Sequence, residues 1–358
     1  MKKFCFILLD SINRTPYIRK YIDACNYRYD IVLWDRTNNS GSCGADQCYY
    51  FKTELLSYGV KEKLQKMKAY IQFSYYVKKV LLKNNYDGVF VFAANTACLC
   101  ANTLLKKYKG RYILDFRDYW QEKHRVLYNI EKKLLDNCYT AVISSRAYES
   151  FLPPFNYYMS HNSQFLNEEQ IIHFRKREIQ KKKLKVACIG GIKYPDFDRQ
   201  VIDYFANDSR FELMYIGRGY EVLTEYCRHK EYTNITIEGE FPISETINKY
   251  EGVDIILNMY GNHTPKLDYA LSNKLYFSAQ LGIPILVCPD TYMAKIVQKY
   301  KTGFVVDIRN PLDKDAVYEQ YCQINWNEFF DHCDLFMNEI IEDEKIFCEM
   351  VRKFTTEV

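Results

Sequence analysis

Short apolar runs alternate with longer helical stretches along this chain, and this alternation restricts its fold more than any other feature. The strand-like runs of the first half are Phe4–Leu9, Ile31–Trp34, Gly88–Phe92, Tyr112–Asp115 and Ala141–Ile143. Those of the second half are Lys185–Ile189, Phe211–Ile216, Ile235–Ile237, Val253–Asn258, Ile283–Val287 and Phe304–Val306. Parallel strands need long crossovers, usually helices, and those helices bury both faces of the sheet. The sequence therefore predicts an α/β fold with parallel sheets.

One stretch interrupts the alternation and predicts a domain boundary. Residues 163–184 (SQFLNEEQIIHFRKREIQKKKL) form a dense charged run, after which the alternation begins again. A chain of 358 residues is also long enough for two domains. We expect an N-terminal Rossmann-like domain at 1–162, a linker at 163–184 and a second such domain at 185–325. The final stretch, 326–358, is expected to be a helix that packs back on the N-terminal domain.

The first third of the chain is strongly basic. Residues 1–111 contain 19 Lys and Arg against 8 Asp and Glu, a charge of +11, whereas the rest carries 30 and 37, a charge of −7. Within a long helix expected at 53–83, one face is formed by Leu64, Met67, Ile71 and Tyr75. The remaining circumference holds Lys61, Lys66, Lys68, Lys79 and Lys83, with Phe73, Tyr75 and Tyr76 among them. Two interpretations stay open, a solvated helix face and an interfacial contact with an anionic membrane.

Composition narrows the class of protein further. No stretch approaches the roughly 18 apolar residues of a membrane span, and the opening apolar run stops at Asp10, too early for a signal peptide. The 13 cysteines show neither a zinc spacing nor a Cys-x-x-Cys pair. We therefore expect a cytoplasmic protein with reduced thiols.

The segment from Ser272 to Val287 is the first candidate binding site. Ser272 and Asn273 are favourable N-cap residues, Gly282 ends the helix that they begin, and Pro284 opens a buried strand. A helix that begins beyond the carboxyl end of a strand directs N–H groups and the positive end of its dipole at that place. The residues alone are compatible with an anion site and equally with a purely structural helix.

Further segments of the second half occur in a recognisable order. They are Ile189–Ile192, Tyr215–Gly219, Asn234–Phe241, Ile247–Asn258, Ser272–Val287 and Lys301–Val306. Together they resemble the donor domain of GT-B glycosyltransferases of the bacterial polysaccharide type, including glycosyltransferase family 4-like and galactofuranosyltransferase-like enzymes. The resemblance implies a GT-B fold, with two Rossmann-like parallel-sheet domains facing a central cleft.

The resemblance also implies a set of donor-binding residues. They are Gly190, Gly191, Lys193, Arg218, Gly239, Phe241, Ser272, Asn273 and Lys274. The lysines, the arginine and the helix N–H groups would stabilise the negative charge of a departing nucleoside diphosphate. No cofactor and no metal are implied, because the nucleotide-sugar is itself the substrate, with a UDP-linked sugar as one candidate.

The N-terminal half adds a turn that follows a predicted strand. Residues 115–120 (DFRDYW) are similar to the Asp-x-Arg-Asp-x-Trp turn of related transferases. An inverting transferase needs a general base, for which Asp118 is the first candidate and Asp115 the second. A retaining transferase would not require one, and the sequence leaves both mechanisms open. Arg117 is expected on the acceptor side, and so is His161, which lies in a segment that resembles the family's hinge.

The resemblance implies transfer of a sugar from a nucleotide-sugar to a lipid-linked glycan acceptor. The expected pathway is cell-surface polysaccharide synthesis, at the inner face of the plasma membrane. Many relatives carry a ribose-binding glutamate five residues before the glycine of their Gly-x-Pro, where this chain has Phe277. Two alternatives therefore stay open, a catalytically inactive GT-B binding subunit of a glycan-assembly complex and a sugar-nucleotide epimerase. No nucleic-acid partner is expected, because no recognisable nucleic-acid-binding motif is present.

Overall fold

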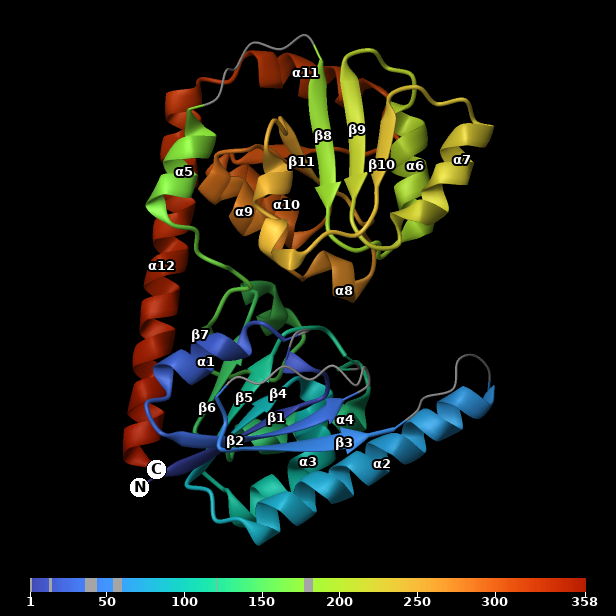
Figure 1. Cartoon of the computed structure of the whole chain (residues 1–358). Helices are drawn as coiled ribbons and strands as arrows, with labels where there is room; N and C mark the ends of the chain where they lie inside the picture. The colour runs from blue at the N-terminus through green and yellow to red at the C-terminus, as the bar shows by residue number, and fades with distance from the viewer. Residues whose placement is uncertain (1, 13–14, 36–43, 54–59, 121, 177–182) are drawn as a thin grey trace. The chain divides into compact units, whose positions relative to one another are not determined.

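The chain forms two compact units, each with its own parallel sheet. A computed structural model describes all residues except 1, 13–14, 36–43, 54–59, 121 and 177–182 (Figure 1). The side chains of residues 60–63 also lie outside this description. Unit 1 comprises Met1–His161 and Ile341–Val358, and unit 2 comprises Asn162–Ile340.

Unit 1 is built on a seven-stranded sheet in which all paired strands are parallel. From one edge to the other, its strands are β3 (Gln47–Lys52), β2 (Arg28–Asp35), β1 (Lys3–Leu8), β4 (Gly88–Phe92), β5 (Tyr112–Phe116), β6 (Thr140–Ile143) and β7 (Tyr158–Met159). Its helices are α1 (Ile18–Ala24), α2 (Val60–Lys83), α3 (Ala94–Lys107) and α4 (Arg125–Leu135). The strand order reverses beside β1, which makes the sheet doubly wound.

Unit 2 repeats this architecture with six parallel strands. Their order is β10 (Ile235–Glu238), β9 (Phe211–Ile216), β8 (Leu184–Ile189), β11 (Ile255–Asn258), β12 (Ile285–Val287) and β13 (Gly303–Val305). The helices are α5 (Glu168–Arg175), α6 (Pro195–Phe205), α7 (Thr224–His229), α8 (Pro265–Asp268), α9 (Asn273–Leu281), α10 (Tyr292–Tyr300) and α11 (Leu312–Cys322). The order reverses beside β8, so the carboxyl ends of β8, β9 and β11 meet at a switch point.

All of the strands predicted from apolar runs are present, and the structure adds β3 and β7. The β3 strand is a half-buried edge strand whose sequence, QCYYFK, contains no Val, Ile or Leu. The β7 strand has only two residues. Both are edge strands, where burial on two faces is not required and the sequence signal is correspondingly weak.

The orientation of the long helix α2 differs from the amphipathic pattern inferred from the sequence. Leu64, Met67, Ile71 and Tyr75 do form one face, but that face is exposed to solvent. The buried face is Ala69, Phe73, Val77, Val80 and Leu81. The placement of Phe73 among the exposed lysines was therefore wrong, because this ring stacks on Trp34 with 5.6 Å between the ring centroids. The helix has two apolar faces, and only one of them is covered.

A last helix, α12 (Trp326–Glu357), contributes to both units. Residues before Ile341 supply Phe329, Cys333 and Phe336 to the core of unit 2. Residues after it supply Phe347, Val351 and Phe354 to the core of unit 1. The packing there is tight, since a Cβ added at Gly88 would lie 2.6 Å from Cζ of Phe354.

Two further features concern the residues that the structure describes. None of their helices combines the length and the apolar character needed to cross a bilayer. Each of their cysteines is a free thiol.

Candidate functional site

Two glycine turns lie against each other at the carboxyl edge of the unit 2 sheet. Gly190 follows β8 and Gly217 follows β9, and both have positive φ, 131° and 138°. A Cβ added at Gly217 would lie 1.9 Å from the carbonyl oxygen of Gly190, so no other residue fits there. The N–H of Ile192 donates to the carbonyl of Arg218 at 3.0 Å. The predicted Gly190-Gly191 turn and Arg218 are therefore brought together through their backbones.

The N-terminus of α9 is fixed beside the end of β11. The Ser272 hydroxyl accepts a hydrogen bond from the N–H of Lys274 at 3.2 Å and donates one to Oδ1 of Asn258 at 2.7 Å. Ser272 is thus the N-cap that its sequence position predicts. Asn258 is the last residue of β11 and is buried, so the cap is tied to the sheet.

Lys274 is the most unusual charge in this region. Only 9% of the residue is exposed, and its Nζ donates to the hydroxyl of Tyr260 at 2.6 Å. Within the described part of the chain, no carboxylate forms an ion pair with it. The Nζ faces the first glycine turn, since a Cβ added at Gly190 would lie 3.8 Å from it. A buried cation without a counter-ion is costly, and an anionic ligand would remove that cost.

Two acidic groups near Lys274 have raised pKa values. Burial raises the pKa of Asp198 to about 7, although the positive charge of Lys274 opposes the shift. Asp198 is 2% exposed, and its Oδ2 has no hydrogen-bond partner among the described residues. Burial likewise raises the pKa of Tyr260, so its phenol is protonated and neutral at neutral pH. Burial disfavours the charge on Lys274 and acts to lower its pKa, and the hydrogen bond from its Nζ to the neutral Tyr260 hydroxyl opposes that effect.

Of the remaining predicted donor residues, Lys193 shares a neighbour with Lys274, whereas Gly239 and Phe241 lie farther along the sheet. The exposed Lys193 places Nζ 5.6 Å from the ring centroid of Tyr260, the same ring that Lys274 contacts. Gly191 is exposed in the first glycine turn, and Asn273 is exposed as the first residue of α9. Gly239 and Phe241 follow β10, two strands away from β8. There, Lys249 lies over the Phe241 ring, with Nζ 5.7 Å from its centroid.

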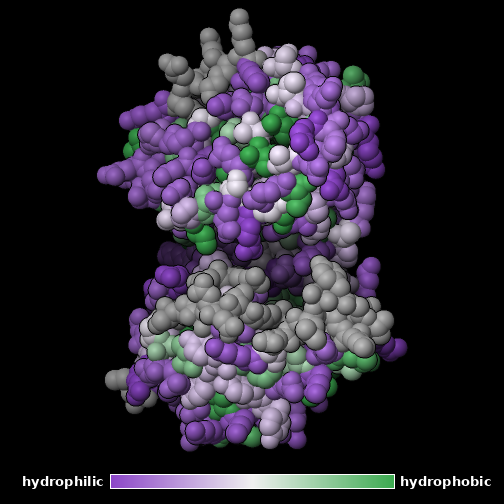
Figure 2. All heavy atoms as spheres, turned by 45° about the vertical axis from the view of Figure 1, so that its right-hand side comes forward, coloured by the Kyte–Doolittle hydropathy of each residue, from purple (hydrophilic) through white to green (hydrophobic). Residues whose placement is uncertain are grey.

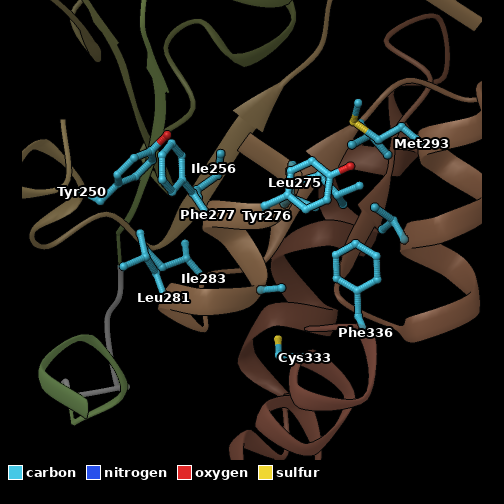
Figure 3. Close-up of a cluster of buried hydrophobic side chains, with 14 of the residues drawn as sticks. Tyr250, Ile256, Leu275, Tyr276, Phe277, Leu281, Ile283, Met293, Cys333 and Phe336 are labelled. Atoms are coloured by element: carbon cyan, nitrogen blue, oxygen red, sulfur yellow. The ribbon is translucent and has the colours of Figure 1, made fainter. Parts of the chain in front are cut away.

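Phe277 belongs to the hydrophobic core rather than to the polar group at the end of α9. Figure 3 shows its ring beside that of Tyr250, and their centroids are 5.9 Å apart. The next aromatic residue, Tyr276, lies on the side of α9 toward Met293 and Phe336 (Figure 3). The α9 helix is therefore buried on both sides beyond its first turn, and position 277 offers no hydrogen-bonding group to a ligand.

In unit 1, Asp115 and Arg117 form a buried ion pair at the end of β5. The guanidinium of Arg117 contacts both carboxylate oxygens, with Nε 2.6 Å from Oδ1 and Nη2 2.7 Å from Oδ2. Oδ2 also accepts from the hydroxyl of Tyr21 at 2.5 Å, and Nη1 donates to the carbonyl of Ser160 at 2.7 Å. Both residues are at most 5% exposed. The pair holds the turn after β5 against the chain near Ser160.

The other two predicted residues of unit 1 differ in their surroundings. Asp118 is exposed, directly after the buried pair. His161 is buried, with Nε2 2.9 Å from Oδ2 of Asp343 and its backbone N–H bonded to Glu344 at 2.7 Å. The structure therefore places His161 in a contact with α12 inside unit 1.

Three residues of the unit 2 centre were not singled out from the sequence. The sequence places Gly217 in a turn and assigns no role to Tyr260 or Asp198. The position of Tyr260 in the sequence could have indicated a site residue, since it follows the end of a buried strand by two residues. For Asp198 the pattern of apolar residues could have indicated burial, because it lies on the same helical face as the buried Val201, Ile202 and Phe205. Among the described residues, no group of three or more His, Cys, Asp or Glu side chains could hold a metal ion.

No family model and no curated protein matches the sequence, but solved structures match over nearly the whole chain. Sucrose-phosphate synthase from Thermosynechococcus elongatus has a TM-score of 0.67 at 9% identity, covering 98% of this chain and 99% of its own. Anabaena HepE in complex with UDP has a TM-score of 0.66 at 9% identity, covering 99% and 100%. A glycosyltransferase from Rickettsia africae has a TM-score of 0.62 at 11% identity, covering 100% of both. At such identities the likeness establishes the architecture, and the chain has the predicted GT-B fold.

Proposed function

We propose that this protein is a glycosyltransferase that takes a sugar from a nucleotide-sugar donor, UDP-linked, and transfers it to a lipid-linked glycan acceptor in cell-surface polysaccharide synthesis. The observation that supports this most is the buried Lys274, which has no carboxylate partner among the described residues and faces the Gly190 turn. Anabaena HepE, whose fold is similar, is described in complex with UDP and with UDP-glucose.

The chemistry assigned to unit 2 is stabilisation of the leaving diphosphate. Lys274 and the first N–H groups of α9 would hold its negative charge. Lys193, whose Nζ lies 5.6 Å from the centroid of the Tyr260 ring, would add to the field, and Arg218 would do so from the second glycine turn. Gly190 and Gly191 would let the phosphates approach the backbone closely. The base of the nucleotide would lie toward Gly239 and Phe241, beyond the end of β10.

The chemistry assigned to unit 1 is activation of the acceptor hydroxyl. Asp118 is the exposed carboxylate and would act as the general base. Asp115 has both oxygens occupied by Arg117 and Tyr21, so we assign it a positioning role for the turn that presents Asp118. His161 and Arg117, which are also buried, would help to hold this turn and the neighbouring chain in place on the acceptor side.

A second candidate function is a GT-B binding subunit without turnover. It is favoured by Phe277, whose ring packs on Tyr250 and leaves the position without a carboxylate for the ribose. Such a subunit would bind the nucleotide but would neither transfer nor hydrolyse the donor.

A thermal-shift panel of UDP, GDP, CDP and ADP, each with and without magnesium, tests the nucleotide site. A ligand that binds only the folded protein stabilises it by about 2.7 kcal/mol at about 100 times its Kd. We expect UDP to raise the melting temperature by several degrees, equally with and without magnesium. No shift with any of the four at millimolar concentration would contradict the proposed donor site. A UDP shift without any release of UDP from UDP-sugars would favour the binding subunit.

The affinity for a UDP-sugar is expected to fall as the pH rises through about 7. Asp198 has its pKa raised to about 7, so it is mostly neutral at pH 6 and mostly ionised at pH 8. Its carboxylate would then repel the diphosphate and compensate part of the charge of Lys274, weakening binding roughly three- to tenfold. Isothermal titration with UDP-glucose at both pH values measures this. Asp198→Asn should bind with the pH 6 affinity at both, and a variant that keeps the parent's pH dependence would contradict the assignment.

A further inference from the structure

The outer face of α2 is an apolar stripe in full contact with solvent. Leu64, Met67, Ile71, Tyr75 and Leu82 are between 54% and 69% exposed. They recur at three- and four-residue steps, apart from one missing turn at Lys78, and so lie on one line along the helix. From Leu64 to Leu82 that line is ~27 Å long at a rise of ~1.5 Å per residue. The buried residues of α2 lie on the opposite side, so the stripe has no role in the core of unit 1.

Among the described side chains of α2, every charged residue beside the stripe is a lysine. Lys66, Lys68, Lys78, Lys79 and Lys83 are all exposed, and none forms an ion pair with another described residue. No acidic residue occurs between Leu64 and Lys83. The neighbouring elements β3 and α3 also have none, and their charged residues are Lys52, Lys106 and Lys107. The neighbouring strand β2 has Asp30 and Asp35, but both are buried and do not reach the surface. An apolar stripe that interrupts a purely basic surface is complementary to a surface with a negative layer over an apolar interior.

We propose that the outer face of α2 docks this protein on an anionic lipid bilayer, with the helix lying in the plane of the headgroups. Leu64, Met67, Ile71 and Leu82 would enter the acyl boundary while the lysines meet lipid phosphates, as in amphipathic interfacial helices. A second copy of the chain would place lysines against lysines across the stripe, which disfavours self-association through this face. This proposal rests on the proposed function, because docking on the bilayer would bring the enzyme to a lipid-linked acceptor.

Hydrophobic residues elsewhere on the described surface are more scattered. Figure 2 shows one face of the molecule on which hydrophilic residues dominate and hydrophobic ones form small separate patches. Exposed side chains such as Val126, Val222, Ile243 and Leu312 lie on different elements and form no line. They therefore provide a matched set of controls for the stripe.

Cosedimentation with vesicles tests the proposal without any nucleotide or sugar. The parent protein is expected to bind vesicles of phosphatidylcholine and phosphatidylglycerol, and to bind vesicles of phosphatidylcholine alone far more weakly. The stripe variant carries Leu64→Ser, Met67→Ser, Ile71→Ser and Leu82→Ser. It should lose binding roughly tenfold or more, because four side chains no longer enter the lipid. The control variant, Val126→Ser, Val222→Ser, Ile243→Ser and Leu312→Ser, should bind like the parent.

A charge variant separates the electrostatic part of the interaction. Lys68→Gln, Lys78→Gln, Lys79→Gln and Lys83→Gln together should remove the preference for anionic vesicles and most of the salt dependence. Lys123→Gln and Lys133→Gln, both exposed elsewhere in unit 1, should leave that preference unchanged.

Three outcomes would overturn the proposal. They are a parent that binds neither kind of vesicle, a stripe variant that binds like the parent, and a parent whose dimer is lost in the stripe variant. UDP binding by the stripe variant is measured in parallel and is expected to equal that of the parent. Loss of vesicle binding by the stripe variant, with UDP binding intact, supports the docking face. Absence of UDP binding in the parent would contradict the proposed transferase function and would leave the docking face unaffected.

Discussion

Replacing Asp118 by alanine is expected to lower the rate of donor turnover by about 10²- to 10⁴-fold, the usual contribution of a general base. Asp118 is the exposed carboxylate of its turn, while Asp115 is held by Arg117 and Tyr21. Because the proposed donor site lies in unit 2, the affinity for the UDP-sugar should stay within about twofold of the parent. Release of UDP from a UDP-sugar and isothermal titration with the same compound give the two quantities.

Asp136→Ala is the matched control for this variant. Asp136 is also an exposed aspartate of unit 1, but it caps α4 and pairs with Lys132 at 3.0 Å. It should leave both turnover and donor affinity unchanged. An Asp118→Ala protein with the parent's turnover would remove Asp118 from the mechanism and would favour a reaction that needs no base from this turn.

Replacing Lys274 by methionine is expected to weaken UDP binding by about 10- to 100-fold. A hydrogen bond to a charged group is worth about 1.5–3 kcal/mol, and Lys274 is the buried cation that faces the Gly190 turn. The same change should leave the ligand-free protein as stable as the parent or more stable, since the buried cation has only Tyr260 as a hydrogen-bond partner among the described residues. Weaker binding together with undiminished stability separates a functional loss from misfolding.

Two comparisons sharpen the Lys274 experiment. Uridine, which has no phosphate, should bind the parent and Lys274→Met equally. Lys295→Met removes an exposed lysine on α10 and should bind UDP like the parent. If Lys274→Met kept the parent's affinity for UDP, the position of the diphosphate at α9 would be wrong.

The sheets could be predicted from sequence because parallel strands are buried on both faces. Such strands appear as continuous apolar runs, as in Phe4–Leu8 of β1, which is fully buried. For α2 the apolar pattern did not show which side of the helix is buried, because its sequence has two apolar faces. Periodicity gives the direction of each face around the helix axis but not which one the sheet covers. Phe73 was therefore misplaced, although the helix itself was found.

The candidate site was accessible to sequence reasoning only in part. Lys274 and Gly190 stand in segments whose order resembles a known domain. Tyr260 and Asp198 converge on Lys274 through the fold, from the ends of different elements, and no spacing along the chain reports that convergence. The role of Asp115 also needed the structure, because only the bidentate contact with Arg117 distinguishes it from Asp118.

Unit 1 is made of two pieces of chain that are separated by the whole of unit 2. On the ribosome, the sequence of unit 2 is therefore complete before that of unit 1. Until the piece Ile341–Val358 emerges, Phe4 and Phe90 lack the ring of Phe354, whose centroid lies 5.9 Å and 5.2 Å from theirs. During synthesis, part of the core of unit 1 therefore stays exposed to solvent after unit 2 is complete. A chain that ends at Ile340 would contain all of unit 2 but would lack the residues that complete the core of unit 1.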